Sequence, residues 1–219
     1  MVEPPPDPWP LRHLVLRTPR LTLRPSDDEG LYELAELALH GIHPPEEMPF
    51  LQPWTDQLPD ELVRGVAQHQ WAARSRLRPN EWSVGFLARC DGQVIGVQDL
   101  SARDFAITRE VSTGSWLGSA YQGRGFGTEM RAAVLLLAFD HLGATTARSG
   151  AYVDNPASLR VSEKLGYCRD GTGTFARRGK AATQIRLLLE ASQLLRPEWT
   201  LEVDCLDGCR ELLGAAGCT

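Results

Sequence analysis

The chain has 219 residues, of which 42% are hydrophobic and 23% are charged, and this is the composition of a globular protein with one substantial core. Its formal net charge of −5 gives no support for a nucleic acid or an anionic membrane as its partner. The first ten residues lack the charged and apolar regions of a secretion signal and no apolar run approaches the roughly 18 residues of a membrane span, so we expect a cytoplasmic protein.

The N-terminal residues 1–19 are rich in proline, which lacks a backbone donor and favours extended chain. We therefore predict a tail that lies on the surface, with order beginning near Arg20. Residues 20–190 form the predicted domain, and residues 191–219 form a C-terminal extension packed on it. The extension carries Cys205 and Cys209, which lack the further ligands of a zinc site, so no metal is expected.

The first half of the predicted domain is mainly helical. Leu21 and Leu23 alternate with polar residues as in a short strand, and Ser26 or Asp27 then opens a helix. A proline-rich stretch over 40–59 carries apolar anchors and predicts an ordered loop, and a second helix is expected over 59–78. The three anchors of this loop are Met48, Phe50 and Trp54.

The second half changes to short β-rich runs. Strands are expected at 82–88, 94–100 and 111–117, the first two joined by a hairpin at Asp91-Gly92. There follow a helix (127–142), a strand (147–153), a helix (155–165), two strands (167–175 and 183–189) and a possible strand at 199–203. This order predicts an α/β (α+β) fold with a mixed sheet of about seven strands and about four helices.

The sharpest motif is the glycine-rich stretch from Gln122 to Thr128, between a strand and an apolar helix. Glycines at alternate positions let a ligand approach main-chain N–H groups at a helix start, which suits a pyrophosphate. A Rossmann turn needs glycine where Thr128 stands, and a P-loop needs Gly-Lys-Ser/Thr, which is missing. The alternative is a structural connection that allows tight packing of the strand against the helix.

The chain resembles the GNAT superfamily of acyltransferases at this motif. The superfamily loop Gln/Arg-x-x-Gly-x-Gly/Ala is matched by Gln122, Gly125 and Gly127. The strand Ser115-Trp116-Leu117-Gly118 and the later motifs Asn155-Pro156-Ala157-Ser158 and Glu163-Lys164-Leu165-Gly166-Tyr167 resemble the ribosomal-protein N-terminal acetyltransferase branch. Nearly the whole chain, including His43-Pro44-Pro45, Met48-Pro49-Phe50 and Pro53-Trp54-Thr55, is similar to a mycobacterial GNAT succinyltransferase.

The resemblance implies a GNAT fold whose central strands splay apart to hold a coenzyme A (CoA) thioester, acetyl-CoA or succinyl-CoA. It places Asn155 on the pantetheine arm and Ser158 near the sulfur, where the serine hydroxyl is the candidate proton donor to the leaving thiolate. Many relatives instead have a tyrosine four residues later, where this chain has Ser162. Tyr152 and Tyr167 are the reserve candidates for the proton donor. The residues expected to bind the cofactor are Trp116, Leu117, Gly118, Gln122, Gly123, Arg124, Gly125, Phe126, Gly127, Thr128, Asn155 and Ser158.

A base must take a proton from the attacking ammonium group. Glu110 is the first candidate, Asp104 the second and His43 the third, although each is also compatible with a surface or loop role. Arg103 or Arg109 is the candidate cation for the distal carboxylate of a succinyl group. Met48, Phe50 and Trp54 are expected either to line the acceptor pocket or to close the core edge.

The sequence thus predicts an N-acyltransferase that acts on a small-molecule or peptide amine, as a homodimer or higher homo-oligomer without nucleic-acid or membrane partners. Two other functions stay open: a CoA-binding sensor or scaffold without catalysis, and an interaction domain whose glycine turn is structural. The first binds CoA without amine-dependent thiol release, and the second does not bind CoA.

Overall fold

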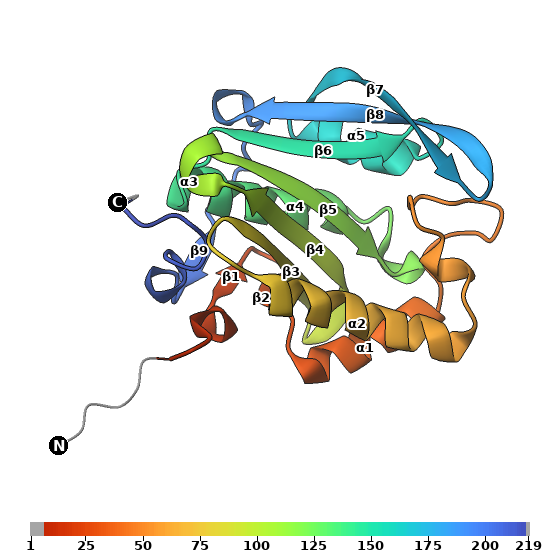
Figure 1. The fold of residues 1–219 in the computed structure, drawn as a ribbon, viewed down its shortest axis with the longest axis horizontal. Coiled ribbons are helices and arrows are strands. Elements are labelled where there is room, and N and C mark those ends of the chain that lie inside the picture. Colours follow the sequence, from red (N-terminus) through yellow and green to blue (C-terminus); the bar gives the residue numbers. More distant parts are fainter. Residues whose placement is uncertain (1–6, 218–219) are drawn as a thin grey trace.

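The computed structural model describes residues 7–217 and has one mixed sheet at its centre (Figure 1). Nine strands run in the order β7-β8-β6-β5-β4-β3-β2-β1-β9. Their bounds are β1 Val15–Arg17, β2 Thr22–Pro25, β3 Glu81–Cys90, β4 Gln93–Arg103, β5 Glu110–Leu117, β6 Thr146–Tyr152, β7 Cys168–Arg177, β8 Lys180–Glu190 and β9 Glu202–Asp204. The predicted mixed sheet is confirmed.

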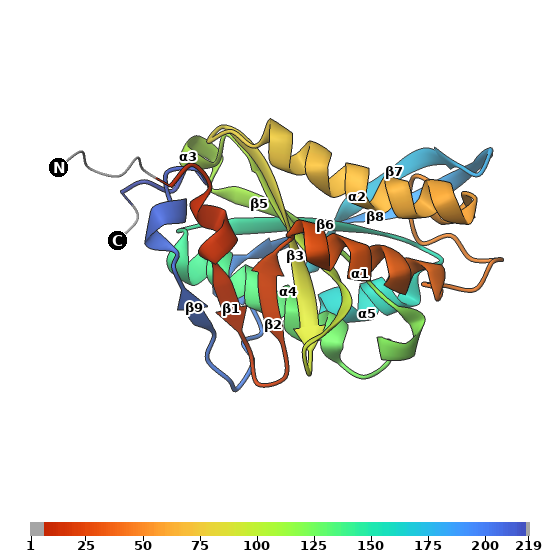
Figure 2. The same cartoon turned by 90° about the horizontal axis from the view of Figure 1, so that it is seen from below.

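Helices cover both faces of the sheet (Figure 2). Helices α1 (Asp28–Leu39) and α2 (Pro59–Arg76) pack on one face, and α4 (Phe126–Leu136) and α5 (Pro156–Lys164) pack on the other. The short α3 (Phe105–Thr108) joins β4 to β5. The two faces are buried by separate apolar clusters, one on α1 and α2 and one, larger, around α4.

Local sequence explains most element ends. Asp27 caps α1 by accepting a hydrogen bond from the N–H of Gly30 at 2.7 Å, and Asn155 caps α5 in the same way. Asp91 and Gly92 both have positive φ, as a two-residue hairpin between β3 and β4 requires. Helix α4 continues as a π-helix over Leu137–His141, shortly before Gly143, which has a φ of +77°.

The expectation that order begins near Arg20 is wrong. A 3-10 helix (Pro10–His13) and β1 precede this residue, and Leu11, Leu14 and Leu16 are almost completely buried. Strand β1 pairs with both β2 and β9, so the two ends of the described chain meet in the sheet. A strand of three residues between prolines leaves little pattern to detect. The prolines of the predicted tail at positions 4–6 lie outside the described residues.

The sheet opens between β5 and β6, its one parallel pair. These strands pair only from Glu110 to Ser112 on β5, opposite Thr146 to Arg148 on β6. Farther along, β5 stays paired with β4 and β6 stays paired with β8, so the two halves of the sheet diverge. The splay predicted from the resemblance is present, and from Thr113 onwards β5 has no backbone pairing with β6.

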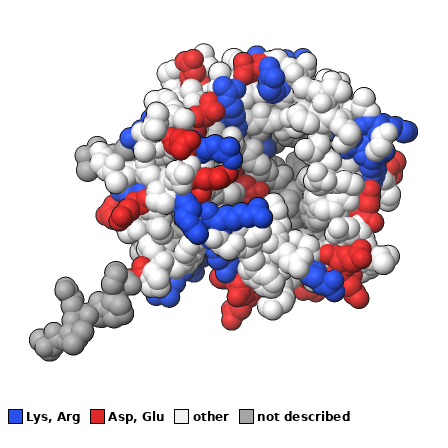
Figure 3. Space-filling view, viewed as in Figure 1, with Lys and Arg blue, Asp and Glu red and all other residues white. Residues whose placement is uncertain are grey.

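One face of the molecule mixes both signs of charge. Acidic and basic side chains are interspersed on the face shown in Figure 3. Within residues 7–217, no helix has both the length and the apolar character needed to cross a bilayer.

Candidate functional site

A cavity of about 670 Å³ occupies the splay between β5 and β6. Its walls come from the loop after α1, the diverging parts of β5 and β6, the glycine turn with α4, and α5. The lining residues used below are His43, Phe50, Gly114, Trp116, Gln122, Gly123, Gly125, Gly127, Thr128, Arg131, Tyr152, Asn155 and Ser158. The cavity therefore passes from the α4/α5 face of the sheet towards the loop that joins α1 and α2.

The glycine turn presents main-chain N–H groups to this cavity. Gly123 and Gly125 have φ of +73° and +84°, the left-handed region that favours glycine. In the described chain, no backbone hydrogen bond outside the helices and strands uses the N–H groups of residues 123–125. The first N–H groups of α4 also lack partners within the helix, since every α-helix starts that way. These donors and the helix dipole form a cradle that fits a diphosphate.

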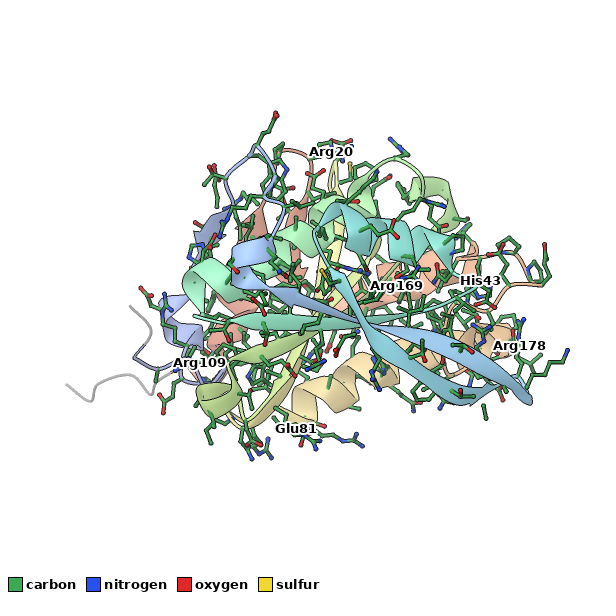
Figure 4. All side chains as sticks on the ribbon, turned by 90° about the horizontal axis from the view of Figure 1, so that it is seen from above. Arg20, His43, Glu81, Arg109, Arg169 and Arg178 are labelled. Carbon is green, nitrogen blue, oxygen red and sulfur yellow. The ribbon has the colours of Figure 1, made fainter. Side chains whose placement is uncertain are left out.

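A second segment braces the turn from behind. Arg20 donates from Nη1 to the carbonyl of Arg124 at 3.0 Å and from Nε to Glu129 Oε2 at 2.6 Å. Glu129 is buried on α4 and also accepts from Thr18 Oγ1 at 2.6 Å. Figure 4 shows Arg20 at the edge of the molecule. Sequence reasoning missed this brace because residues 18–20 and 129 are far apart in the chain.

Some residues of the predicted cofactor set have structural roles instead. Phe126 is buried in the core, and the exposed guanidinium of Arg124 lies 5.0 Å from the centre of its ring. Gly118 does not line the cavity: a Cβ there would lie 2.5 Å from the side chain of Leu37, so this glycine lets α1 approach. The side-chain amide of Gln122 donates to the carbonyls of Ile42 and Leu117 and pins the loop to the end of β5.

Helix α5 brings two predicted residues to the same cavity. Asn155 Oδ1 accepts from the N–H of Ser158 at 3.1 Å, which leaves the amide nitrogen of its side chain for another partner. Both residues line the cavity, and Ser158 is half-buried. Ser162, one turn later, is completely buried and donates from Oγ to the carbonyl of Ser158 at 3.0 Å.

Residues 20–167 match the acetyltransferase (GNAT) domain, which is more than half of the chain. The chain belongs to this family. The splay, the glycine turn and the two helices beside it are therefore the framework of a GNAT domain.

Solved structures share the fold at low sequence identity. RimJ of Mycobacterium smegmatis in complex with CoA-disulfide is 18% identical, with a TM-score of 0.67 over 85% of this chain and 91% of that one. RimL, a ribosomal L7/L12 alpha-N-protein acetyltransferase in complex with coenzyme A, is 18% identical, with a TM-score of 0.61 over 79% and 95%. A chimera of the spermidine N-acetyltransferase SpeG of Vibrio cholerae is 19% identical, with a TM-score of 0.61 over 79% and 96%.

The loop after α1 closes the other end of the GNAT cavity through a series of aromatic contacts. Ring centres are 5.8 Å apart for His43 and Phe50, 5.1 Å for Phe50 and Trp54, and 5.7 Å for Trp54 and Trp116 of β5. Phe50 lines the cavity, whereas Met48 is buried and Trp54 supports the loop from outside the wall. Of the three predicted anchors, the structure thus places Phe50 alone on the wall.

Two arginines of the β7–β8 hairpin hold this loop. Arg178 bonds Asp56 with distances of 2.8 and 2.5 Å and donates to the carbonyls of Pro45 and Glu47. Arg177 donates to the carbonyl of Met48 and pairs with Asp154, and its guanidinium lies 4.2 Å from the ring centre of Tyr152. Arg178 and His43 lie at the same end of the molecule in Figure 4.

The predicted bases are not arranged for the cavity. Glu110 is outside its wall, at the paired end of β5, where Arg148 Nε donates to its Oε2 at 2.8 Å. Asp104 precedes α3, also away from the cavity. His43 lines the wall, but its Nδ1 donates to the carbonyl of Pro44, so in the neutral ring its Nε2 accepts from Thr55 Oγ1 at 2.8 Å. The lone pair of His43 is therefore already engaged.

The predicted cations for an acyl carboxylate are also distant. Arg103 pairs with Glu81, and the guanidinium of Arg109 lies 5.4 Å from the ring centre of Phe105. Figure 4 shows Arg109 and Glu81 well away from the end with His43 and Arg178. The length of β5 separates these two arginines from the cavity, which the sequence alone could not show.

Asp99 of β4 is a carboxylate that sequence reasoning missed. It lies between Gly85 of β3 and Gly114 of β5 in the register of the sheet, on the face covered by α2. A Cβ on Gly114, which lines the cavity, would lie 3.9 Å from Asp99 Oδ2. Burial raises the pKa of Asp99 to about 6, while the charge of His69 and a hydrogen bond from Gln70 act in the opposite direction.

The two reserve tyrosines are both buried. Tyr152 lines the cavity, and its hydroxyl has no hydrogen-bond partner among the described residues. Burial raises the pKa of Tyr152, and the charge of Arg177 opposes that rise. The hydroxyl of Tyr167 lies 3.2 Å from Thr113 Oγ1, and burial likewise raises the pKa of Tyr167. Both phenols are therefore held in their neutral form.

Proposed function

We propose that the protein is an N-acyltransferase that moves an acetyl or succinyl group from coenzyme A to a primary amine within a ternary complex. The main support is the cradle of N–H groups at Gly123, Gly125 and the start of α4, which opens into the splay between β5 and β6. A fixed set of donors at a helix start suits the CoA diphosphate. The CoA-bound neighbours RimJ and RimL, which share the fold, are consistent with that ligand.

The residues present fit a CoA thioester along the whole cavity. The glycine turn would hold the diphosphate, and the free side-chain amide of Asn155 would donate to the pantetheine arm. The thioester, when bound, supplies an activated acyl carbon. Backbone N–H groups of β5 beyond Ser112, which β6 leaves unpaired, would donate to the thioester oxygen as it gains negative charge.

We place the base at Asp99 rather than at Glu110. Asp99 does not itself line the cavity: its carboxylate lies on the α2 face beside Gly114, which does, and the amine would approach from the loop on that side. A pKa of about 6 leaves Asp99 ionised at neutral pH while keeping it a stronger base than an ordinary carboxylate. A proton could then pass from the ammonium to Asp99, directly or through water.

Ser158 would donate a hydrogen bond to the sulfur. Its Oγ makes no hydrogen bond within residues 7–217, and the residue lines the cavity at the first turn of α5. We expect Ser158→Ala to lower kcat about 10-fold to 100-fold, because a neutral donor to a developing thiolate is lost. Steady-state thiol release measures the effect, and an unchanged kcat would remove Ser158 from the reaction.

The loop held by Arg178 would form the amine side of the cavity. We expect Arg178→Ala to raise KM for the amine several-fold and to leave CoA affinity unchanged, because three anchor points of the loop disappear together. Lys180→Ala, on the same hairpin and exposed, is the matched control. Equal kinetics for the two variants would show that the loop is ordered without Arg178.

The function is tested by thiol release with acetyl-CoA and succinyl-CoA in parallel, against small amines, polyamines and peptides with free N-termini. Amine-dependent release with either donor supports the proposal and also identifies the acyl group. Tight CoA binding without release by any amine would instead indicate a sensor or scaffold. Absence of CoA binding in calorimetry would overturn the proposal.

A further inference from the structure

Arg131 of α4 is a buried cation on the wall of the cavity. Only 4% of its surface is exposed. Its Nη1 donates to Ser162 Oγ at 2.9 Å and its Nη2 donates to Ser115 Oγ at 3.2 Å. Its Nε has no hydrogen-bond partner among the described residues. The guanidinium therefore joins α4, α5 and β5 through neutral hydroxyls.

This charge has no carboxylate partner within residues 7–217. Other cavity cations, Arg160 and Lys164 of α5, are at the solvent edge. The titratable group that interacts electrostatically with the guanidinium is Tyr167, and Tyr152 lines the same cavity. A buried charge held only by neutral groups is costly, and the cost falls when an anion joins it. Burial lowers the pKa of Arg131, but a guanidinium keeps its proton at neutral pH.

The position of Arg131 indicates which anion would join the buried guanidinium. Its hydrogen bonds to Ser162 and Ser115 place it on the face of the sheet that carries the glycine turn and α5, where a CoA thioester would enter, and not on the face of Asp99. Its Cα lies about 9 Å along α4 from the turn, at 1.5 Å per residue. Its partner Ser162 is hydrogen-bonded to the carbonyl of Ser158, the residue proposed to lie beside the sulfur.

We propose that the guanidinium of Arg131 binds the sulfur of coenzyme A and stabilises the thiolate that leaves. This inference rests on the proposed function. When the amine attacks, a C–N bond forms at the acyl carbon, the C–S bond breaks, and the sulfur keeps the electron pair. The base takes the proton of the amine. Arg131 keeps its protons throughout, so its positive charge balances the new anion.

The test is the thiol pKa of CoA bound to the enzyme, read from the ultraviolet absorbance of the thiolate during a pH titration. We expect this pKa to lie at least about one pH unit below that of free CoA in the same buffer, because an opposite charge is adjacent. Arg131→Met should remove most of the difference and lower kcat about 100-fold. Arg131→Lys should keep part of the difference. Arg64→Met, on the exposed face of α2, should keep all of it.

Each outcome decides the proposal. A bound thiol that titrates like free CoA in the wild type overturns it, even if Arg131→Met does not fold, and so does an unchanged shift in a folded Arg131→Met. Loss of turnover with succinyl-CoA but not with acetyl-CoA would assign Arg131 to the acyl carboxylate instead. CoA calorimetry and wild-type turnover test the proposed function separately, so an active wild type with an unshifted thiol overturns this inference alone.

Discussion

Replacing Gly125 with glutamate should weaken CoA binding at least about 100-fold, or roughly 2.7 kcal/mol. Gly125 has a φ of +84° and lines the cavity at the start of α4. The substitution forces a side chain into the left-handed region and places a carboxylate where the cradle would hold a diphosphate. Both effects weaken binding. The side chain keeps the diphosphate away from the backbone N–H groups, and its negative charge repels the phosphates. Isothermal calorimetry with CoA measures the change.

Two control variants separate charge and position from backbone strain. Gly179→Glu has a similar φ of +71° with open space around it, so it carries the same strain, about 1–2 kcal/mol, away from the cavity. It should bind CoA normally. Gly127→Ala should also bind, since its Cβ would make only ordinary contacts at 3.6 Å with Leu117 and 3.7 Å with Val161. Normal binding by Gly125→Glu would show that the turn is structural.

The sequence predicted the elements that have strong periodicity or caps. Helices α1, α2, α4 and α5 and the β3–β4 hairpin follow from apolar spacing, Asp27, Asn155 and Asp91-Gly92. Strands β1 and β9 were not predicted, or only as a possibility, because strands of three residues depend on long-range pairing. Their stability comes from partners almost 190 residues away, which local patterns do not contain.

The residues of the candidate site likewise fall into those that local sequence predicts and those that it does not. The glycine turn, Asn155 and Ser158 are contiguous motifs, so they could be predicted before the fold was available. Arg131 and Asp99 could not, because an arginine in an apolar helix and an acid in an apolar strand show their role only when packing reveals what surrounds them. Their signal in the sequence is weak but present: each is a charged residue at a position that the pattern marks as buried.

The proposed roles of Arg131 and Asp99 act from opposite faces of the sheet. The cation lies on the α4/α5 face, and the carboxylate lies on the α2 face, with Gly114 and Ser115 of β5 between them. Acyl transfer creates negative charge at the sulfur and releases a proton from the amine on the opposite side of the acyl carbon. Separation of the two groups by a strand lets each keep its charge without forming an ion pair that would neutralise both.

Asp99→Asn should therefore abolish most turnover while making the protein more stable. We expect kcat to fall about 100-fold to 1000-fold, with CoA affinity unchanged, because the amide cannot accept the proton. In the wild type, kcat should rise with pH as Asp99 ionises near pH 6. Glu110→Gln is the matched control: it removes a partly exposed partner of Arg148 outside the cavity and should leave kcat unchanged. If Glu110→Gln loses activity and Asp99→Asn does not, the base is Glu110.

The stability change follows from the same pKa. Between pH 3.8 and about 6 the unfolded chain loses the proton of Asp99 while the folded chain keeps it, so this group destabilises the fold progressively as the pH rises. Above pH 6 the cost is constant, up to roughly 3 kcal/mol for a rise of this size. Asp99→Asn removes it, so the free energy of unfolding should exceed that of the wild type at pH 7 and approach it near pH 4. Urea unfolding at both pH values measures this, and equal gains at pH 4 and pH 7 would show that the carboxylate is not desolvated.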